Sequence, residues 1–447
     1  MATGITSFGE LGKLGGFELT YPNKATREEI LSGNRAGALI GYCPKGSEGD
    51  LFCGDNLPIL RSLLFDRGMR GKVDLVYIDP PFATGSRFES RKQSHAYSDN
   101  LRGAEFLEFL RSRLILLHEL LSDSGSLYLH LDSRMICEAK IILDEVFGVE
   151  NFRALITRKK SNPKNYTSKS YGNIADYILF YSKTDSYIWN RQTTEPTEEH
   201  LKEYRYIDDK GRHHMRVPLH APGVRNGETG GEWKGMLPPP GKHWQYKPST
   251  LDQLDADGHI HWSSSGNPRK KVYLDEHEGV SVQDIWMDFK DAHNQNIKIT
   301  GYPTEKNPEL LERIVKASSN EGSLVMDCFA GSGTTLDVAG KLGRRWIGVD
   351  ESCEAIATIC QRITKGTAKM GSFRDSEPTN EEEMLLFKEE PRVFGLSIVG
   401  SMLEPLKQQA QQADGHQPDA RCELSRLLCL LPDCEFEAAL SASGGSS

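Results

Sequence analysis

The sequence predicts an α/β protein built on a doubly wound parallel sheet. Apolar runs typical of buried strands alternate with segments of helical periodicity along residues 51–147 and again along 309–363. The run that begins at Val73 stops at a Pro-Pro pair, and the run over 323–328 stops at a glycine turn. Open sheets of this kind bind their ligands at the carboxyl ends of their strands, so both stops mark candidate site positions.

The composition is that of an ordinary globular protein. Of the 447 residues, 38% are hydrophobic and 26% charged, and no apolar run approaches the length of a membrane span. The first residues show no basic segment followed by an apolar one, so we expect no secretory signal. Nine cysteines without a Cys-x-x-Cys pair predict reduced thiols, a cytoplasmic location and no zinc site. The net charge of −9 is a poor guide to partners, because the charge is segregated along the chain.

The first half of the chain supplies a regular α/β pattern after an irregular start. Residues 1–47 hold few periodic apolar positions and are predicted to form an N-terminal arm, while residues 48–190 form the first half of the sheet. Residues 83–102 are polar and contain Gly and Ser, which predicts a mobile loop over the site. The expected elements are a strand ending at Gly54-Asp55, a helix over 57–65, the strand ending at Asp79, a helix over 104–121, a strand over 127–132, a helix through 147 and a strand over 178–182.

The turn after the strand that begins at Val73 is the first candidate site. The strand delivers the Asp79 carboxylate and the Phe82 ring to the sheet edge, and Pro80 and Pro81 make the turn rigid. A rigid acid–Pro–Pro–aromatic turn suits chemistry on a flat, weakly nucleophilic amine, such as the exocyclic amino group of a nucleobase.

A basic segment follows over residues 151–175, with no acid in it. It is either a solvated loop or an edge that contacts nucleic-acid phosphates, with aromatic rings available for stacking. The second interpretation makes five cations candidate DNA-binding residues: Arg158, Lys159, Lys160, Lys164 and Lys169.

Residues 191–290 interrupt the alternation of strands and helices, and their many Gly, Pro, Trp and His residues indicate an insert. We interpret it as a target-recognition region, with a plain packing insertion as the alternative. Its histidines lack the spacing of a metal site. Side chains able to read base edges are Arg212, Arg225, Lys234, Lys242 and Arg269, among which the sequence does not select.

Residues 291–370 restore the α/β pattern, and residues 371–447 are predicted to be a tail of unknown role. The expected elements are a helix over 309–317, a strand over 323–328, a helix over 334–342, a strand over 346–349 and a helix over 354–363. The glycine turn lets a ligand approach the backbone and a helix N-terminus, and the acid Asp350 ends the next strand, where it can bind ribose hydroxyls. The pair predicts an adenosine-containing cofactor with little phosphate; the alternative is a plain glycine turn and a capping Asp.

The Asp-Pro-Pro-Phe at 79–82 and the Phe-Ala-Gly-Ser-Gly-Thr at 329–334 resemble the two signature motifs of the amino-directed DNA methyltransferases. Their order, with a variable block between them, is similar to the beta class, a circular permutation of the common methyltransferase sheet. Gly54-Asp55-Asn56 and residues 300–306 resemble further motifs of that family, although the usual Lys-Pro is here Lys306-Asn307-Pro308. The resemblance covers about residues 48–365.

The resemblance implies an enzyme of a restriction–modification system that uses S-adenosylmethionine to methylate double-stranded DNA. Asp at 79 favours adenine N6 over cytosine N4, and RNA or a protein glutamine amide are further alternatives. A non-catalytic DNA-binding subunit would be expected to have degraded motifs, and a nicotinamide oxidoreductase would need a third glycine. A cognate restriction endonuclease and a homodimer are left open as partners, and no membrane partner is expected.

The resemblance also implies roles for individual residues. Asp79 and the Pro80 carbonyl would accept hydrogens from the target amino group, Phe82 would stack on the base flipped out of the duplex, and Pro81 would hold the turn. The implied cofactor contacts are Asp55 for the adenine, Asp350 for the ribose, Thr304 and Lys306 for the carboxylate, and Asp327, Phe329, Ala330, Gly331, Ser332, Gly333 and Thr334 for the cradle.

Overall fold

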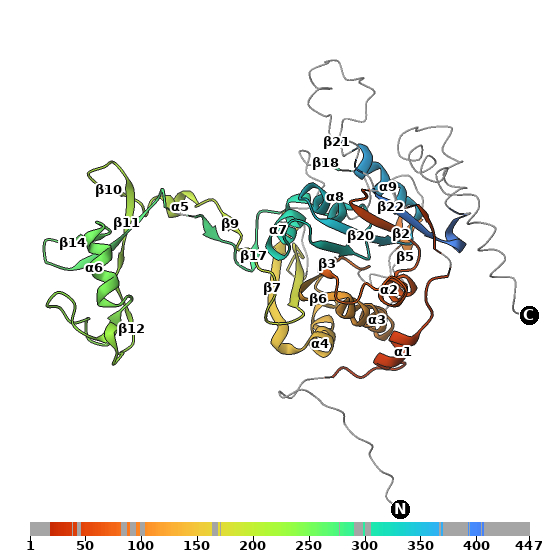
Figure 1. Cartoon of the computed structure of the whole chain (residues 1–447), viewed down its shortest axis with the longest axis horizontal. Helices are drawn as coiled ribbons and strands as arrows, with labels where there is room; N and C mark the ends of the chain where they lie inside the picture. Colours follow the sequence, from red (N-terminus) through yellow and green to blue (C-terminus); the bar gives the residue numbers. More distant parts are fainter. Residues whose placement is uncertain are drawn as a thin grey trace, which may run out of the picture. The chain divides into compact units, whose positions relative to one another are not determined.

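The computed structural model divides the chain into two compact units, of which the smaller is Arg191–Val282 and the larger the remainder (Figure 1). The smaller unit lies within the insert predicted at 191–290. The structure describes residues 18–37, 39–42, 46–81, 87–89, 95–98, 103–162, 169, 171–276, 278–289, 298–299, 305–365, 368–369, 392, 394–403 and 405.

A single large sheet forms the centre of the larger unit. Within the described residues its strand order is β1-β22-β2-β20-β19-β3-β6-β8-β7-β17. The strands are β1 (Leu39–Tyr42), β2 (Gly49–Cys53), β3 (Val73–Ile78), β6 (Leu121–Leu131), β7 (Phe152–Lys159), β8 (Ala175–Ser182), β17 (Ile285–Trp286), β19 (Leu324–Asp327), β20 (Arg345–Asp350) and β22 (Gly395–Val399).

The middle of the sheet is parallel. Strands β2, β20, β19, β3 and β6 all pair in parallel, with Val325 opposite Leu75 where the late and early halves of the sequence meet. The residues of β3 from Leu75 to Ile78 are almost fully buried, as expected of a strand covered on both faces. The predicted doubly wound sheet is therefore confirmed, and its late strands lie beside β3 as a permuted chain requires.

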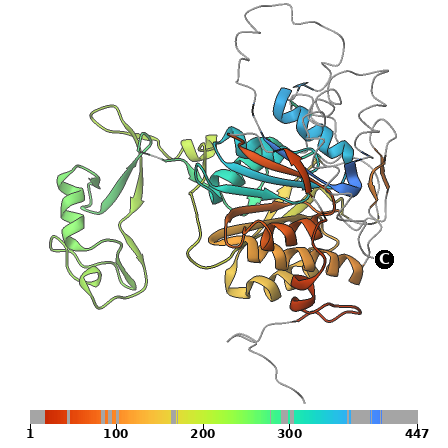
Figure 2. The same ribbon diagram turned by 45° about the vertical axis from the view of Figure 1, so that its right-hand side comes forward.

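Helices cover both faces of this sheet (Figure 2). The helices from the first half of the chain pack together on one face, and those from the second half lie on the other, so the carboxyl ends of β19 and β3 flank a topological switch point. On the first face are α1 (Arg27–Ser32), α2 (Asn56–Phe65), α3 (Ala104–Leu120) and α4 (Ile136–Phe147); on the second are α7 (Pro308–Ser318), α8 (Thr334–Lys341) and α9 (Cys353–Lys365).

One edge of the sheet differs from the parallel prediction. Strand β8 pairs antiparallel with β6, and β7 pairs antiparallel with β8. Residues 152–159 are thus a strand rather than an open basic loop. Side chains alternate between the two faces of a strand, so one of the predicted DNA-binding cations, Arg158, points into the protein.

The two ends of the chain also contribute strands that were not predicted. Strand β22 pairs parallel with β2, and β1 pairs antiparallel with β22. Residues 39–42 of the predicted N-terminal arm 1–47 and residues 395–399 of the predicted tail 371–447 therefore extend the sheet at its other edge. Both strands are short, so the neighbouring strand rather than a periodic pattern makes them extended.

The smaller unit has its own sheet and core. Its four-stranded sheet has the order β10-β11-β15-β14. A cluster of buried side chains, Leu219, Trp233, Trp244, Leu251 and Ile260, forms the core. Its elements are β9 (Thr193–Thr194), α5 (Glu198–Leu201), β10 (Tyr206–Ile207), β11 (His213–Pro218), β12 (His220–Pro222), β13 (Lys242–Trp244), α6 (Pro248–Ala256), β14 (Ile260–Trp262), β15 (Pro268–Tyr273) and β16 (Val280–Ser281).

Two short ladders complete the described secondary structure: β4 (Arg87–Glu89) with β5 (His95–Ser98), and β18 (Lys298–Ile299) with β21 (Ala368–Lys369). Most of the loop predicted at 83–102 lies outside the described residues. Among the helices that are described, none has the length and apolar character that a membrane crossing needs.

Candidate active site

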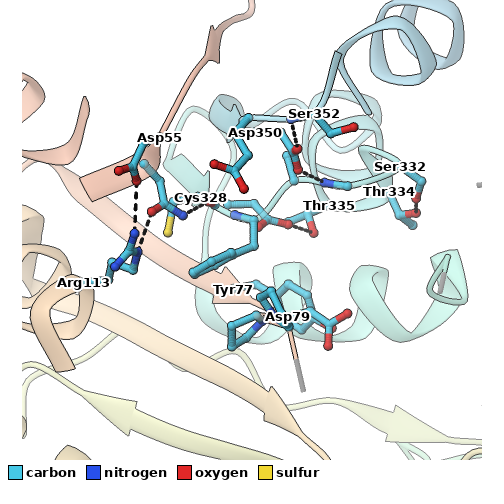
Figure 3. A pocket seen from close by; sticks show the side chains of 18 of the residues that line it. Asp55, Tyr77, Asp79, Arg113, Cys328, Ser332, Thr334, Thr335, Asp350 and Ser352 are labelled. Carbon is cyan, nitrogen blue, oxygen red and sulfur yellow. Dashed lines mark hydrogen bonds and ion pairs between the residues drawn. The ribbon is translucent and has the colours of Figure 1, made fainter. Parts of the chain in front are cut away.

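A pocket of about 140 Å³ opens at the carboxyl ends of β2, β3, β19 and β20. Each of these strands supplies an acid at or just after its last residue: Asp55, Asp79, Asp327 and Asp350. Figure 3 shows this arrangement, with side chains from both halves of the sequence around one space. The structure thus brings together the two motif regions that lie about 250 residues apart in the chain.

Asp79 lies in the pocket with one carboxylate oxygen occupied and one open. Its Oδ2 is 2.6 Å from the Lys306 ammonium nitrogen, and the two side chains are only 17% and 12% exposed. Its Oδ1 is buried and has no hydrogen-bond partner in the described part of the chain. A buried carboxylate oxygen without a donor is costly, so this atom is suited to accept a hydrogen bond from a ligand.

Lys306 is held in place by its neighbours on both sides. Glu305 forms a buried ion pair with Arg362 of α9, with both side chains at most 3% exposed. Asn307 caps α7 by accepting a hydrogen bond from the Glu309 N–H at 2.8 Å, and Pro308 follows at the first helical position. The departure from Lys-Pro thus makes a regular helix start. The sequence assigned Lys306 to a cofactor carboxylate; the structure places it against Asp79.

A buried chain of polar groups lies behind the Asp79 turn, across β3, β6, β8 and β7. The Tyr77 hydroxyl is 2.7 Å from His130 Nδ1, and His130 Nε2 is 3.0 Å from Asp176 Oδ2. Burial raises the pKa of Tyr77, and the charges of Asp79 and Asp327 raise it further. Burial alone would raise the pKa of Asp176, but His130 and Arg158 hold it below its usual range.

Arg158 closes this chain, so its prediction as a DNA-binding residue is wrong. Its guanidinium is fully buried and lies 3.5 Å from Asp176 Oδ2. The inward face of β7 carries it into the protein, where it neutralises a buried acid. Lys159 and Lys160 are half-buried and Lys169 is exposed, while Lys164 lies outside the described residues.

The glycine turn after β19 is organised by Asp327, which is 3% exposed. Its carboxylate accepts hydrogen bonds from the Phe329 N–H at 3.0 Å and the Thr335 hydroxyl at 2.6 Å. Burial raises the pKa of Asp327 to about 7. Gly333 has φ +74°, and a Cβ there would lie 2.8 Å from Ile359, so this position requires glycine.

Asp350 joins the glycine turn to the end of β20. Its two carboxylate oxygens accept the backbone N–H groups of Gly331 at 2.8 Å and Ser352 at 2.9 Å. Burial raises its pKa to about 6. The next residue, Glu351, lines the pocket and reaches solvent, but the surrounding protein partly desolvates its carboxyl and, with the charge of Asp55, raises its pKa. Sequence reasoning missed Glu351; its only signal was a second acid after the strand.

Asp55 lies on the opposite side of the pocket and caps α2. Its Oδ1 accepts the Leu57 N–H at 3.0 Å and lies 3.1 Å from the Arg113 guanidinium. Asn56 bridges the halves of the sheet by donating to the Cys328 carbonyl at 2.7 Å. No pattern in the sequence indicated Arg113, which is 6% exposed and reaches the site from the middle of α3.

An aromatic wall completes the pocket. The Arg113 guanidinium lies 3.6 Å from the centre of the Phe109 ring, and Phe109 in turn contacts Phe329 at 5.8 Å between ring centres. Phe109 was expected only as part of an amphipathic helix. Two predicted site residues, Phe82 and Thr304, lie outside the described residues. In the part of the chain that the structure describes, no group of acids, His or Cys is placed to hold a metal ion.

Comparison with known proteins decides the family. The model of the DNA methylase family matches residues 73–361, which is more than half of the chain. The chain belongs to the DNA methylase family. The match includes both the Asp79 turn and the glycine turn at 331–333, so the family predicted from these two motifs is confirmed.

Individual DNA methylase relatives agree with this assignment. The Type II methyltransferase M.EcaI of Enterobacter cloacae is 53% identical over 316 residues, covering 70% of this chain and 70% of that protein. The Mod subunit of the Type III restriction-modification enzyme StyLTI of Salmonella typhimurium is 26% identical, covering 76% of this chain and 57% of the subunit. Among solved structures, the cytosine-N4-specific PvuII DNA methyltransferase shares 17% identity at a TM-score of 0.38, covering 76% of this chain and 91% of that one.

Proposed function

We propose that this DNA methyltransferase transfers a methyl group from S-adenosylmethionine to the N6 amino group of adenine in double-stranded DNA, as part of a restriction–modification system. The observation that carries the proposal is the open Oδ1 of Asp79, buried beside the rigid Pro80-Pro81 turn at the pocket. Cytosine N4 is the second candidate, because it presents the same kind of exocyclic amino group.

Asp79 is suited to activate a poor nucleophile. The lone pair of an aromatic amino group is delocalised into the ring, and two acceptors on its hydrogens would draw the nitrogen toward tetrahedral geometry. Asp79 Oδ1 and the Pro80 carbonyl are the proposed acceptors, and Lys306 keeps the other carboxylate oxygen occupied and the side chain in place. Asp79 Oδ1 would hold the amino nitrogen toward the methyl group that S-adenosylmethionine would supply, with sulfur leaving as a neutral thioether and the amino proton passing through Asp79 Oδ1 to solvent.

The residues around the pocket fit the methyl donor, which supplies an electrophilic methyl group on a positively charged sulfur. The glycine turn offers close backbone approach, and the acids Asp327, Asp350 and Glu351 offer negative charge. We assign the ribose hydroxyls to Asp350 and the exposed Glu351 together, and the adenine to the side of the pocket formed by Asp55 and Phe329. Residues 330–334 keep the role that the resemblance implies for them, which is to form the cradle around the cofactor.

Binding of S-adenosylmethionine is expected to tighten about three- to tenfold between pH 6 and pH 8. A cation lowers the pKa of nearby carboxyls, so bound donor favours ionised Asp327 and Asp350, whose pKa values in the free protein are about 7 and about 6. Proton release on binding makes affinity rise with pH and level off above the higher pKa. Calorimetric titration with the donor and with S-adenosylhomocysteine, whose sulfur is neutral, measures the difference. Equal pH dependence for the two compounds would contradict the placement of the sulfonium near these acids.

The target base is tested by incubating the full chain with double-stranded DNA and donor labelled on its methyl group. We expect label on N6-methyladenosine after digestion to nucleosides, and sequencing of the modified positions to show one short site. Label on N4-methylcytosine would replace adenine with the second candidate. Absence of label from DNA would refute the proposed reaction.

A further inference from the structure

We propose that one face of the four-stranded sheet in the smaller unit binds the phosphodiester backbone of DNA, with Arg216, Arg269 and Lys271 as the contacting cations. The inference rests on the proposed function and deepens it, because it states where in the insert the substrate is held. The sheet, β10-β11-β15-β14, is drawn in green in Figure 1.

The register of the sheet places these residues on the same side. Arg216 lies opposite Lys271, and Arg269 lies opposite both Pro218 and His261. Residues directly opposite each other in antiparallel strands share a face, and so do residues two apart in one strand. Tyr206, His214 and Tyr273 extend the same face through their own cross-strand pairs. His214 and Tyr273 are themselves buried, so the basic face that reaches solvent consists of five residues: Tyr206, Arg216, His261, Arg269 and Lys271.

The other face of the sheet is covered. Lys270 belongs to it and donates a hydrogen bond to the Tyr246 hydroxyl at 3.0 Å. Ile260, which lies opposite Lys270, packs into the core cluster with Leu251 of α6 and Trp244. The basic face is therefore the side of the sheet that the hydrophobic core does not use.

The cations of the basic face are not held in ion pairs within the described part of the chain. Arg216, Arg269 and Lys271 form no ion pair among the described residues, whereas Arg212 and Lys234 in the same unit pair with Asp275 and Asp255. Like charges directly opposite each other in a sheet destabilise it, so the Arg216–Lys271 pair is unfavourable unless an anion lies between the two. The positive charges also act on the neighbouring His261. Burial lowers the pKa of His261 most, and the charges of Arg216 and Lys271 lower it further.

Arg216 is also held ready for an acceptor. Its guanidinium lies 3.8 Å from the centre of the Tyr206 ring, which fixes its plane. Its Nε is buried and has no hydrogen-bond partner in the part of the chain that is described. A hollow of about 680 Å³ adjoins it, lined by Arg205, Arg216 and Arg269 together with Lys202, and Glu203 is the acid in that lining.

The spacing of these cations fits a row of phosphates rather than a single small anion. Arg269 and Lys271 are two residues apart in one extended strand, so their side chains start about 7 Å apart. That spacing is comparable to the distance between successive phosphates of one DNA strand. Arginine forks bind phosphate oxygens in pairs, and the face offers cations on both β11 and β15. An acidic protein surface is the competing partner.

The test uses the full chain and the double variant Arg216→Gln with Lys271→Gln. Binding to a duplex with the methylation site and to one without it is followed by fluorescence anisotropy between 50 and 300 mM salt. We expect about tenfold weaker binding to both duplexes, and a decrease of about 1 to 2 in the slope of log affinity against log salt. The KM for DNA should rise while kcat at saturating DNA and the affinity for S-adenosylmethionine stay within twofold.

Lys270→Gln is the matched control, because Lys270 lies on the covered face of the same sheet, where it donates to the Tyr246 hydroxyl, and its replacement should leave the salt slope unchanged. Lys271→Gln alone is the second variant if the double variant unfolds, and it should lower the slope by about 1. An unchanged slope in these variants, with wild-type methylation of DNA intact, would overturn the inference. So would loss of binding to the cognate duplex alone, which would indicate base readout. Absence of DNA methylation in the wild type would instead overturn the proposed function.

Discussion

Replacing Asp79 with Ala is expected to lower kcat for methyl transfer by at least about 10³-fold while the affinity for S-adenosylmethionine changes by no more than a few-fold. The substitution removes the Oδ1 that the amino group needs and also the ion pair between Asp79 Oδ2 and Lys306 at 2.6 Å. The acids that surround the donor, Asp327 and Asp350, are untouched. Single-turnover kinetics on DNA and calorimetry with the donor separate the two effects.

Asp79→Asn is the informative companion, because it keeps the shape and one carbonyl oxygen. We expect it to remain strongly impaired, since the amide is a weaker acceptor and no longer pairs with Lys306. Asp74→Asn is the control for position. Asp74 lies on the same strand as Asp79 but far from the pocket, and its carboxylate accepts a hydrogen bond from Ser122. If Asp79→Ala retained full activity, the site would have to be assigned elsewhere.

Replacing Asp350 with Ala is expected to produce the opposite pattern, with donor affinity lowered about 10- to 100-fold. The carboxylate does more than offer oxygens to a ribose, because it fastens the Gly331 and Ser352 backbone groups at 2.8 and 2.9 Å. Its loss therefore releases the glycine turn as well as removing a ligand contact. Calorimetry gives the affinity, and kcat at saturating donor should fall much less than the affinity does.

Glu351→Gln separates the two roles of the Asp350–Glu351 pair, which are contact with the donor and support of the glycine turn. Glu351 is exposed, so its replacement should lower donor affinity only about threefold to tenfold and leave the thermal unfolding midpoint unchanged. Asp350→Ala should lower both. An Asp350→Ala protein that bound the donor as tightly as the wild type would contradict the assignment of this edge of the sheet to the cofactor.

Local patterns in the sequence predicted the central elements well. Helix α3 was expected at 104–121 and is Ala104–Leu120, and the strand at 346–349 is Arg345–Asp350. Both segments combine strong periodicity or a continuous apolar run with clear stops, so local preference and tertiary burial agree. The Asp79 turn and the glycine turn were also found from local signals, because prolines restrict the backbone and glycines allow conformations that other residues avoid.

Other features depended on contacts between distant segments. Arg158 looked like a surface cation because its neighbours in sequence are basic, but the pairing of β7 with β8 turns it toward Asp176. Strand β22 exists because β2 offers it a free edge. Arg113 and Phe109 enter the pocket because α3 packs against α2, where Arg113 contacts Asp55 and Asn56. Nothing in the spacing of 104–121 separates them from core positions.

The sequence by itself determined the chemistry: a rigid Asp79 turn, a glycine turn and an acid after the next strand, in the order of a permuted methylase. The tertiary structure decided which carboxylate oxygens of Asp79 and Asp350 already have a partner within the protein. It occupied Asp79 Oδ2 with Lys306 and left Oδ1 open, and it tied both oxygens of Asp350 to backbone N–H groups. Hydrogen-bond satisfaction in a buried site depends on groups brought together from distant positions in the chain, so it becomes visible only in the folded protein.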